Sequence, residues 1–304
     1  MPLWGDRHIA LFANHGLRNQ LLDDNLPALA RLAPCVYRIY TLYDDVEAIE
    51  SAPLFGVLKN LMPVQFHFLD HVPDVLNGIF DPAINRMIVA NQQAVSDTAQ
   101  GDALVFLTAD CIMSDNALGN AAEHILDGKR AVMITGPRVT WESFEPVLGT
   151  LNPSPPALVA AISRHLHHVE KCSFMDSPTH NNYWPNHISH RFPTGWVVHN
   201  FHWHPLMVNP PNRFIIPERT IDNQWLSLLM QNIDDYHLVQ DSDELTVCSL
   251  TPREHFRGTP MYEFPPGGPD AEKLKIWIKH FTDPMHKIFS TIPTIFHSED
   301  LKCE

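Results

Sequence analysis

The feature that most constrains the fold is an alternation along the first 140 residues. Short apolar runs at 8–13, 36–42, 64–69, 103–107 and 132–135 read as strands. Between them, apolar residues recur at helical spacing over 19–32, 45–61, 84–99 and 115–126, and Asp115 is the expected N-cap of the last helix. Strands that alternate with helices form right-handed βαβ units, so the sequence predicts an α/β fold with a mostly parallel sheet flanked by helices.

Beyond residue 140 the alternation stops and proline becomes frequent. Helices are expected at 157–169, 220–230 and 271–282, strands within 195–208 and 238–250, a polar loop at 177–192 and a proline-rich linker at 260–269. Pro284 is expected to end or kink the last helix. We therefore divide one large domain into residues 1–140, a loop-rich half at 141–258, and a C-terminal linker and amphipathic helix at 259–304.

Composition excludes several classes of protein. The 44% of hydrophobic residues can form a core, which excludes a disordered chain. Lys and Arg number 21 against 35 Asp and Glu, a net charge of −14, so a nucleic-acid partner is not expected. Five scattered cysteines without a CxxC pair favour a reduced, cytoplasmic protein, and neither a signal peptide nor an apolar run of spanning length is evident.

Polar residues follow the first four predicted strands. Ligands of an open parallel sheet bind beyond the carboxyl ends of its strands, so these residues mark a candidate site for a cation or a sugar. The chain contains neither GxGxxG nor GxxxxGK[ST], which disfavours dinucleotide binding and a P-loop. The residues at this predicted edge are Asn14, His15, Asp44, Asp45, Asp70 and Asp110.

The most informative segment is 85–118, NRMIVANQQAVSDTAQGDALVFLTADCIMSDNAL. A helix carrying Arg86 leads into an apolar strand that stops at Thr108-Ala109-Asp110. This segment resembles the nucleotide-sugar half of GT-A glycosyltransferases, especially the inverting enzymes of family 2. The resemblance follows the strand order through residue 140 or so, but its motifs are specific only within 85–118. It implies a GT-A-like Rossmann-type fold in which residues 1–140 bind a nucleoside-diphosphate sugar.

The resemblance also assigns donor-binding residues. Asp110 matches the last carboxylate of the D-x-D motif, which in that family holds a divalent cation, here Mn²⁺ or Mg²⁺. Thr108 replaces the first acid, so either the cation takes ligands from elsewhere or the enzyme works without a metal. Arg86 would face the phosphates, and Asp44 or Asp45 the base and ribose. The resemblance places the loop that closes over the base at Phe12–His15, which includes Asn14, and the remaining donor residues implied are Asp70 and Ala109.

Histidines concentrate in the second half. Strand-like alternation over 195–205 puts His202 and His204 on one face, a spacing that suits one metal ion. In several GT-A enzymes a C-terminal histidine completes the cation site, so the resemblance lets His202 or His204 join Asp110. The predicted acceptor pocket contains Trp196, His187 and His190.

An acidic residue at the start of the helix expected near 220 matches the base that deprotonates the acceptor hydroxyl in family 2 enzymes. Asp222 is the match and Glu218 the second candidate, although Asp222 or Thr220 could equally serve as a helix N-cap. The Q-x-x-R-W motif of processive synthases is absent, so a membrane polysaccharide polymerase is not expected.

These observations predict a glycosyltransferase that moves a sugar to a hydroxyl of a glycan, protein or small molecule. The sequence identifies no nucleophile and leaves retention open beside inversion. A zinc hydrolase built on His199, His202, His204 and Asp110, or a non-catalytic sugar-nucleotide-binding module, are the alternatives. The lysine-bearing C-terminal helix either rests on an acidic membrane surface, as a peripheral contact, or packs on the domain.

Overall fold

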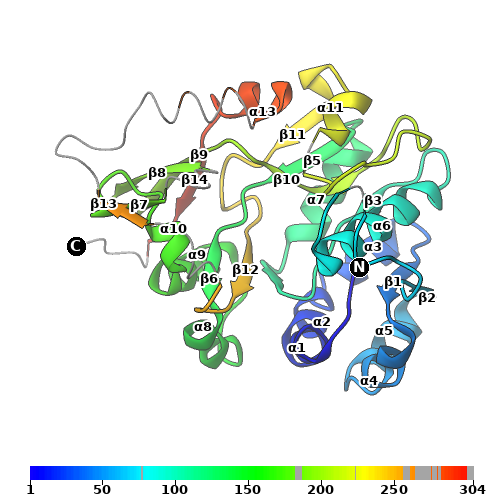
Figure 1. The fold of residues 1–304 in the computed structure, drawn as a ribbon. Helices are drawn as coiled ribbons and strands as arrows, with labels where there is room; N and C mark the ends of the chain where they lie inside the picture. Colours follow the sequence, from blue (N-terminus) through cyan, green and yellow to red (C-terminus); the bar gives the residue numbers. More distant parts are fainter. Residues whose placement is uncertain are drawn as a thin grey trace. The chain divides into compact units, whose positions relative to one another are not determined.

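A computed structural model describes the chain apart from residues 77, 182–186, 223, 256–260, 264–274, 276–278, 280–281 and 300–304. It has a mixed α/β fold with several small sheets, some of them parallel (Figure 1). Two compact units are present. Unit 1 comprises Met1–Met133 and Pro205–His237, and unit 2 comprises Ile134–His204 and Leu238–Glu304. The predicted boundaries at residues 140 and 258 stay predictions.

Unit 1 begins with helices, so the strand predicted at 8–13 is wrong. α1 (Asp6–Leu11), the π-helix η1 (Phe12–Gly16) and α2 (Leu17–Gln20) follow one another without a break. Burial explains the error, because the buried positions 9, 12, 16 and 20 recur every three to four residues, as on one helix face. The helix predicted over 19–32 is interrupted, and its second part is α3 (Leu26–Leu32).

The next two predicted strands are confirmed as a parallel pair. β1 (Tyr37–Thr41) and β2 (Val64–Phe68) lie side by side, with Tyr37 opposite Val64 and Thr41 opposite Phe68 (Figure 1). The connection contains η2 (Tyr43–Asp45), α4 (Val46–Glu50) and α5 (Phe55–Leu61). The predicted helix at 45–61 is thus split, and Pro53 lies between its two parts.

The segment that carries the family resemblance folds as helix, strand, turn, short strand and helix. These elements are α6 (Pro82–Ser96), β3 (Leu104–Val105), β4 (Cys111–Met113) and α7 (Ala117–Leu126). The N-cap of α7 is Asn116 and not the predicted Asp115, because the helix begins one residue later than expected.

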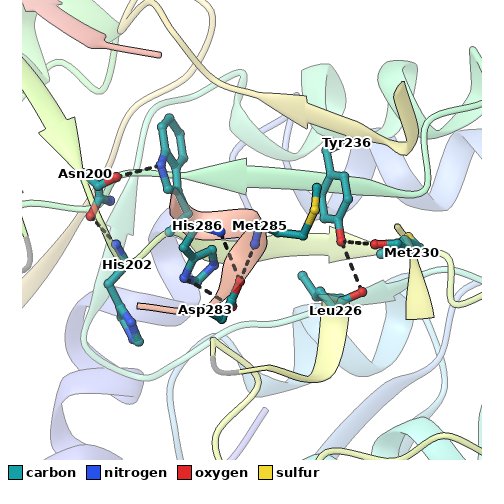
Figure 2. Close-up of polar contacts among 9 residues, drawn as sticks. Asn200, His202, Leu226, Met230, Tyr236, Asp283, Met285 and His286 are labelled. Carbon is teal, nitrogen blue, oxygen red and sulfur yellow. Dashed lines mark hydrogen bonds and ion pairs between the residues drawn. The ribbon is translucent and has the colours of Figure 1, made fainter. Parts of the chain in front are cut away.

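A four-stranded sheet of order β11-β5-β10-β3 completes unit 1. Its other strands are β5 (Ala131–Ile134), β10 (His204–Val208) and β11 (Tyr236–Leu238), and β3 pairs antiparallel with β10. The helix predicted at 220–230 is the shorter α11 (Trp225–Leu229), followed by η3 (Ile233–Asp235). The hydroxyl of buried Tyr236 donates to the carbonyls of Leu226 and Met230 and so ties β11 to α11 (Figure 2).

The described residues of unit 2 form two strand pairs and a three-stranded sheet. β6 (Arg138–Thr140) lies parallel to β12 (Val247–Thr251), and β7 (Thr179–Asn181) antiparallel to β13 (Met261–Glu263). The three-stranded sheet is the antiparallel sheet β14-β9-β8, made of β14 (Thr294–His297), β9 (Gly195–Asn200) and β8 (His187–Phe192) (Figure 1). A Cβ atom at Gly195 would overlap the Phe296 carbonyl oxygen, so this close strand pairing requires glycine.

Two predictions for this unit need correction and one is confirmed. The loop expected at 177–192 contains β7 and β8, although 182–186 lie outside the described residues. The strands expected within 195–208 are confirmed as β9, which ends at Asn200, and β10, which begins at His204. Pro284 does not end a helix but begins α13 (Pro284–Phe289), with Asp283 as N-cap. Helix 157–169 is α9 (Pro155–His165) followed by α10 (His168–Lys171).

The helix predicted at 271–282 lies almost entirely outside the described residues. α8 (Trp141–Leu148) is a further helix among the described residues of unit 2. Among the described helices, none combines the length and the apolar character needed to span a bilayer.

Candidate functional site

The turn that carries Asp110 is held in place by close packing. Ala109 is buried, and a Cβ atom at Gly16 of η1 would lie only 3.0 Å from the Ala109 carbonyl oxygen. The hydroxyl of Thr108 donates to the Cys111 sulfur at 2.9 Å across the turn. Thr108, at the first D-x-D position, therefore hydrogen-bonds within the turn, and Asp110 is half-buried.

Asp110 interacts electrostatically with the imidazole of His8, which also senses the charge of Arg7. The pKa of His8 lies below its ordinary value. Partial desolvation is the largest cause and the Arg7 charge adds to it, while the Asp110 carboxylate acts in the opposite direction. The three groups are thus close enough to interact electrostatically. A carboxylate and an imidazole are a ligand combination that first-row divalent cations accept.

The acidic residues after β1 and β2 lie at one edge, because the two strands are parallel and in register. The Asp70 carboxylate accepts a hydrogen bond from the Tyr43 backbone N–H at 3.1 Å, which joins the ends of the two strands. Asp45 accepts from the Gly5 N–H at 3.0 Å. Asp44 is exposed. Both hydrogen-bonded carboxylates organise the loops of this edge; Asp70, like Asp44, is exposed, and Asp45 is half-buried.

The predicted donor loop at the N-terminus is partly wrong. Phe12 has no exposed surface, so it belongs to the core and is not available to close over a nucleotide base. The reason is the helical conformation, which turns Phe12 inward and leaves Asn14 exposed and His15 half-buried.

Arg86 lies in the first turns of α6. It follows buried Asn85, whose side-chain amide donates to the carbonyls of Asp74 and Ile79 and so fixes the start of α6. The Nε atom of Arg86 is buried, and none of the described residues accepts a hydrogen bond from it. A buried donor without an acceptor costs about 1–3 kcal/mol, so this nitrogen fits a site at which a ligand supplies the acceptor.

The predicted base, Asp222, follows a segment that is hydrogen-bonded to α6, the helix of Arg86. Gln92 of α6 donates to the Pro217 carbonyl at 2.8 Å. Glu218 is exposed and Asp222 half-buried. Asp222 is not an N-cap, because α11 begins at Trp225 with Gln224 at that position. The capping role that competed with catalysis for Asp222 is therefore wrong.

In unit 2 the structure groups three histidines. The His202 ring lies 5.5 Å from that of His204 and 5.6 Å from that of His286, measured between centroids. The Asn200 side chain accepts from the His202 N–H at 2.9 Å and its carbonyl from the Trp203 indole at 3.1 Å (Figure 2). Asn200 thus shapes the turn that presents His202.

His286 was not predicted, and Asp283 holds it. One Asp283 oxygen accepts from the N–H groups of Met285 and His286, and the other lies 3.6 Å from His286 Nδ1 (Figure 2). Both side chains are only 4% exposed. The sequence signal was an Asp-Pro pair with a histidine three residues after the aspartate, typical of a capped helix start.

A second imidazole–carboxylate pair joins β8 to α10. His187 Nε2 lies 2.9 Å from the Glu170 carboxylate, and the two side chains are 15% and 7% exposed. Burial would raise the pKa of Glu170, but His187 and Arg138 outweigh it and hold the pKa below its usual range. His187 is therefore oriented by a buried carboxylate, as in many general bases. Glu170 carries no sequence motif and was missed.

The other acceptor residues differ in their exposure. Trp196 is 4% exposed, and its ring stacks on that of Phe296 with 4.9 Å between the ring centroids. Because this ring is buried against the neighbouring strand, its predicted role as an acceptor platform is wrong. His190 is exposed on β8. His199 contacts the Ser290 carbonyl at 3.1 Å through Nδ1.

Asp110 belongs to unit 1, whereas His202 and His204 belong to unit 2, and their predicted common cation stays a prediction. Comparison of the chain with protein-family models, with curated proteins and with solved structures found no match.

Proposed function

We propose that the protein is a glycosyltransferase that transfers a sugar from a nucleoside-diphosphate sugar to a hydroxyl acceptor, with a GT-A-like arrangement of its donor half. The order helix, strand, Asp110 turn and helix in the segment that resembles family 2 supports this proposal. The observation that carries it is the buried Nε atom of Arg86, for which the described residues provide no acceptor. A diphosphate would supply one.

Each residue then has a chemical task. Arg86 donates to the diphosphate and stabilises the charge that develops on it as the sugar leaves. Asp44 hydrogen-bonds the ribose hydroxyls from the solvent-facing edge of β1 and β2. Asp222 accepts the proton of the acceptor hydroxyl, which leads to inversion in a single displacement.

The divalent cation implied by the resemblance would be held by Asp110. When bound, it neutralises charge on the donor diphosphate. Arg7 adds a positive charge close to the same place and favours an anionic ligand there.

Nucleotide binding tests the proposal directly. UDP, GDP, CDP and dTDP are titrated into the protein by calorimetry, with and without Mn²⁺. One of them should bind, and Arg86→Gln should weaken binding about 10–100-fold, since a hydrogen bond to a charged group contributes about 1.5–3 kcal/mol. Exposed Arg18 provides the matched control. Arg18→Gln should bind like the wild type.

A second variant separates an enzyme from a binding module. Asp222→Asn should keep nucleotide affinity and lower the rate of donor turnover by about 10²–10⁴-fold, the usual contribution of a general base. Binding of none of the nucleotides would refute the proposal. Unchanged turnover in Asp222→Asn would refute the assigned base. Stoichiometric bound zinc, together with a hydrolytic activity that needs no nucleotide, would favour the zinc hydrolase.

A further inference from the structure

A third group of ionisable side chains lies in unit 2, apart from the histidines already described. It joins the last residue of β14, His297, to the chain segment that follows β11. His297 Nε2 lies 2.8 Å from an Asp241 carboxylate oxygen and 3.7 Å from an Asp243 oxygen. One potential ligand atom from each residue lies within 4.8 Å of the other two.

The main chain holds these residues in place. The Ile295 N–H donates to the Gln240 carbonyl at 2.7 Å, and the Ser242 N–H donates back to the Ile295 carbonyl at 2.9 Å. The His297 N–H donates to the Ser242 hydroxyl at 3.1 Å. The backbone positions of the three residues are therefore set by hydrogen bonds that do not involve their side chains.

Their charges are not balanced. Two carboxylates face one imidazole, and among the described residues no Lys or Arg nitrogen lies within 4 Å of either carboxylate. Even a protonated His297 leaves one negative charge, whereas a divalent cation would neutralise both carboxylates. The side chains are 34%, 53% and 54% exposed, so water can fill the remaining coordination positions.

We propose that Asp241, Asp243 and His297 bind a divalent first-row transition metal ion, with Zn²⁺ bound more tightly than Mn²⁺. Ligand atoms at about 2.0–2.2 Å from such an ion lie about 3.0–3.5 Å apart, and the two observed separations bracket this range. The imidazole favours a transition metal, since Mg²⁺ and Ca²⁺ prefer all-oxygen sites. This site is independent of the proposed transferase activity.

Calorimetric titration of the full chain with Zn²⁺ alone tests the site. Replacement of the nitrogen ligand in His297→Ala should remove one bound ion per chain or weaken it at least about 10–100-fold, the loss seen even for outer-sphere changes. Asp241→Asn and Asp243→Asn should act in the same direction. His71→Ala and Asp234→Asn, which alter exposed residues of unit 1, are the controls and should bind as the wild type does.

His297→Gln separates a metal site from a plain ion pair. Gln retains a hydrogen-bond donor for Asp241 but is a poor metal ligand. The proposal expects loss of one ion with an unchanged melting temperature in metal-free buffer. Equal Zn²⁺ stoichiometry and affinity in His297→Ala and the wild type, or no binding by the wild type, would overturn it. Because no nucleotide is present, neither result depends on the transferase proposal.

Discussion

Two helices, one in each unit, begin with the same dipeptide. α6 of unit 1 starts at Asp81-Pro82 and α13 of unit 2 at Asp283-Pro284. In both, the aspartate accepts hydrogen bonds from the N–H groups two and three residues later. Proline suits this first helical position because it lacks the N–H that would have no partner there.

The surroundings of the two aspartates differ. Asp81 is exposed, whereas Asp283 is buried and faces the equally buried His286. α6 is 15 residues long and α13 only 6. The shared Asp-Pro motif therefore marks where each helix begins. We expect burial of the aspartate to determine how much its cap contributes to the free energy of unfolding.

The largest effect is expected for Asp283→Ala. The variant loses two capping hydrogen bonds and leaves a buried imidazole without its carboxylate. Together these should lower the free energy of unfolding by about 2–4 kcal/mol. Urea denaturation followed by tryptophan fluorescence measures it. If Asp283→Ala and Asp81→Ala lowered the free energy of unfolding equally, burial would add nothing to the stability that the cap contributes.

A smaller effect concerns the cap of α10, which is a histidine. His167 Nδ1 accepts from the Val169 N–H, and burial, reinforced by the His168 charge, lowers the pKa of His167 to about 4. Below pH 6.5 the unfolded chain takes up a proton at this residue and the folded protein does not. Stability should therefore fall as the pH drops from 6.5 to about 4.

His167→Asn tests this cap, because Asn can cap the helix without titrating. Denaturation curves between pH 4 and pH 7 should show a shallower slope for the variant than for the wild type. Parallel slopes would contradict a buried, neutral His167.

The smallest effect is expected for Asp81→Ala. An exposed N-cap contributes about 1 kcal/mol, and Asp81→Asn, which keeps the acceptor, should change stability by only a few tenths. The same denaturation assay applies. A loss above about 2 kcal/mol would mean that α6, and with it Arg86, depends on this cap as strongly as α13 depends on Asp283.

The candidate site was predictable to different degrees. The parallel ends of β1 and β2 placed Asp45 and Asp70 correctly at one edge, because strand direction follows from the alternation of strands and helices. Glu170 and His286 were missed, since each becomes notable only through a partner distant in the chain or through its burial. Phe12 and Trp196 were misassigned because the sequence alone does not distinguish an aromatic residue of the core from one that lines a binding pocket.

The sequence by itself determined the mixed α/β class, most of the helices and strands, and the high number of histidines. Those features depend on local periodicity and composition, which neighbouring residues set. Only the tertiary structure decided that residues 8–13 are helical, that Pro284 begins a helix, and that His297 meets Asp241. Burial and contacts between distant segments control these outcomes, and a linear pattern does not encode which distant segments meet.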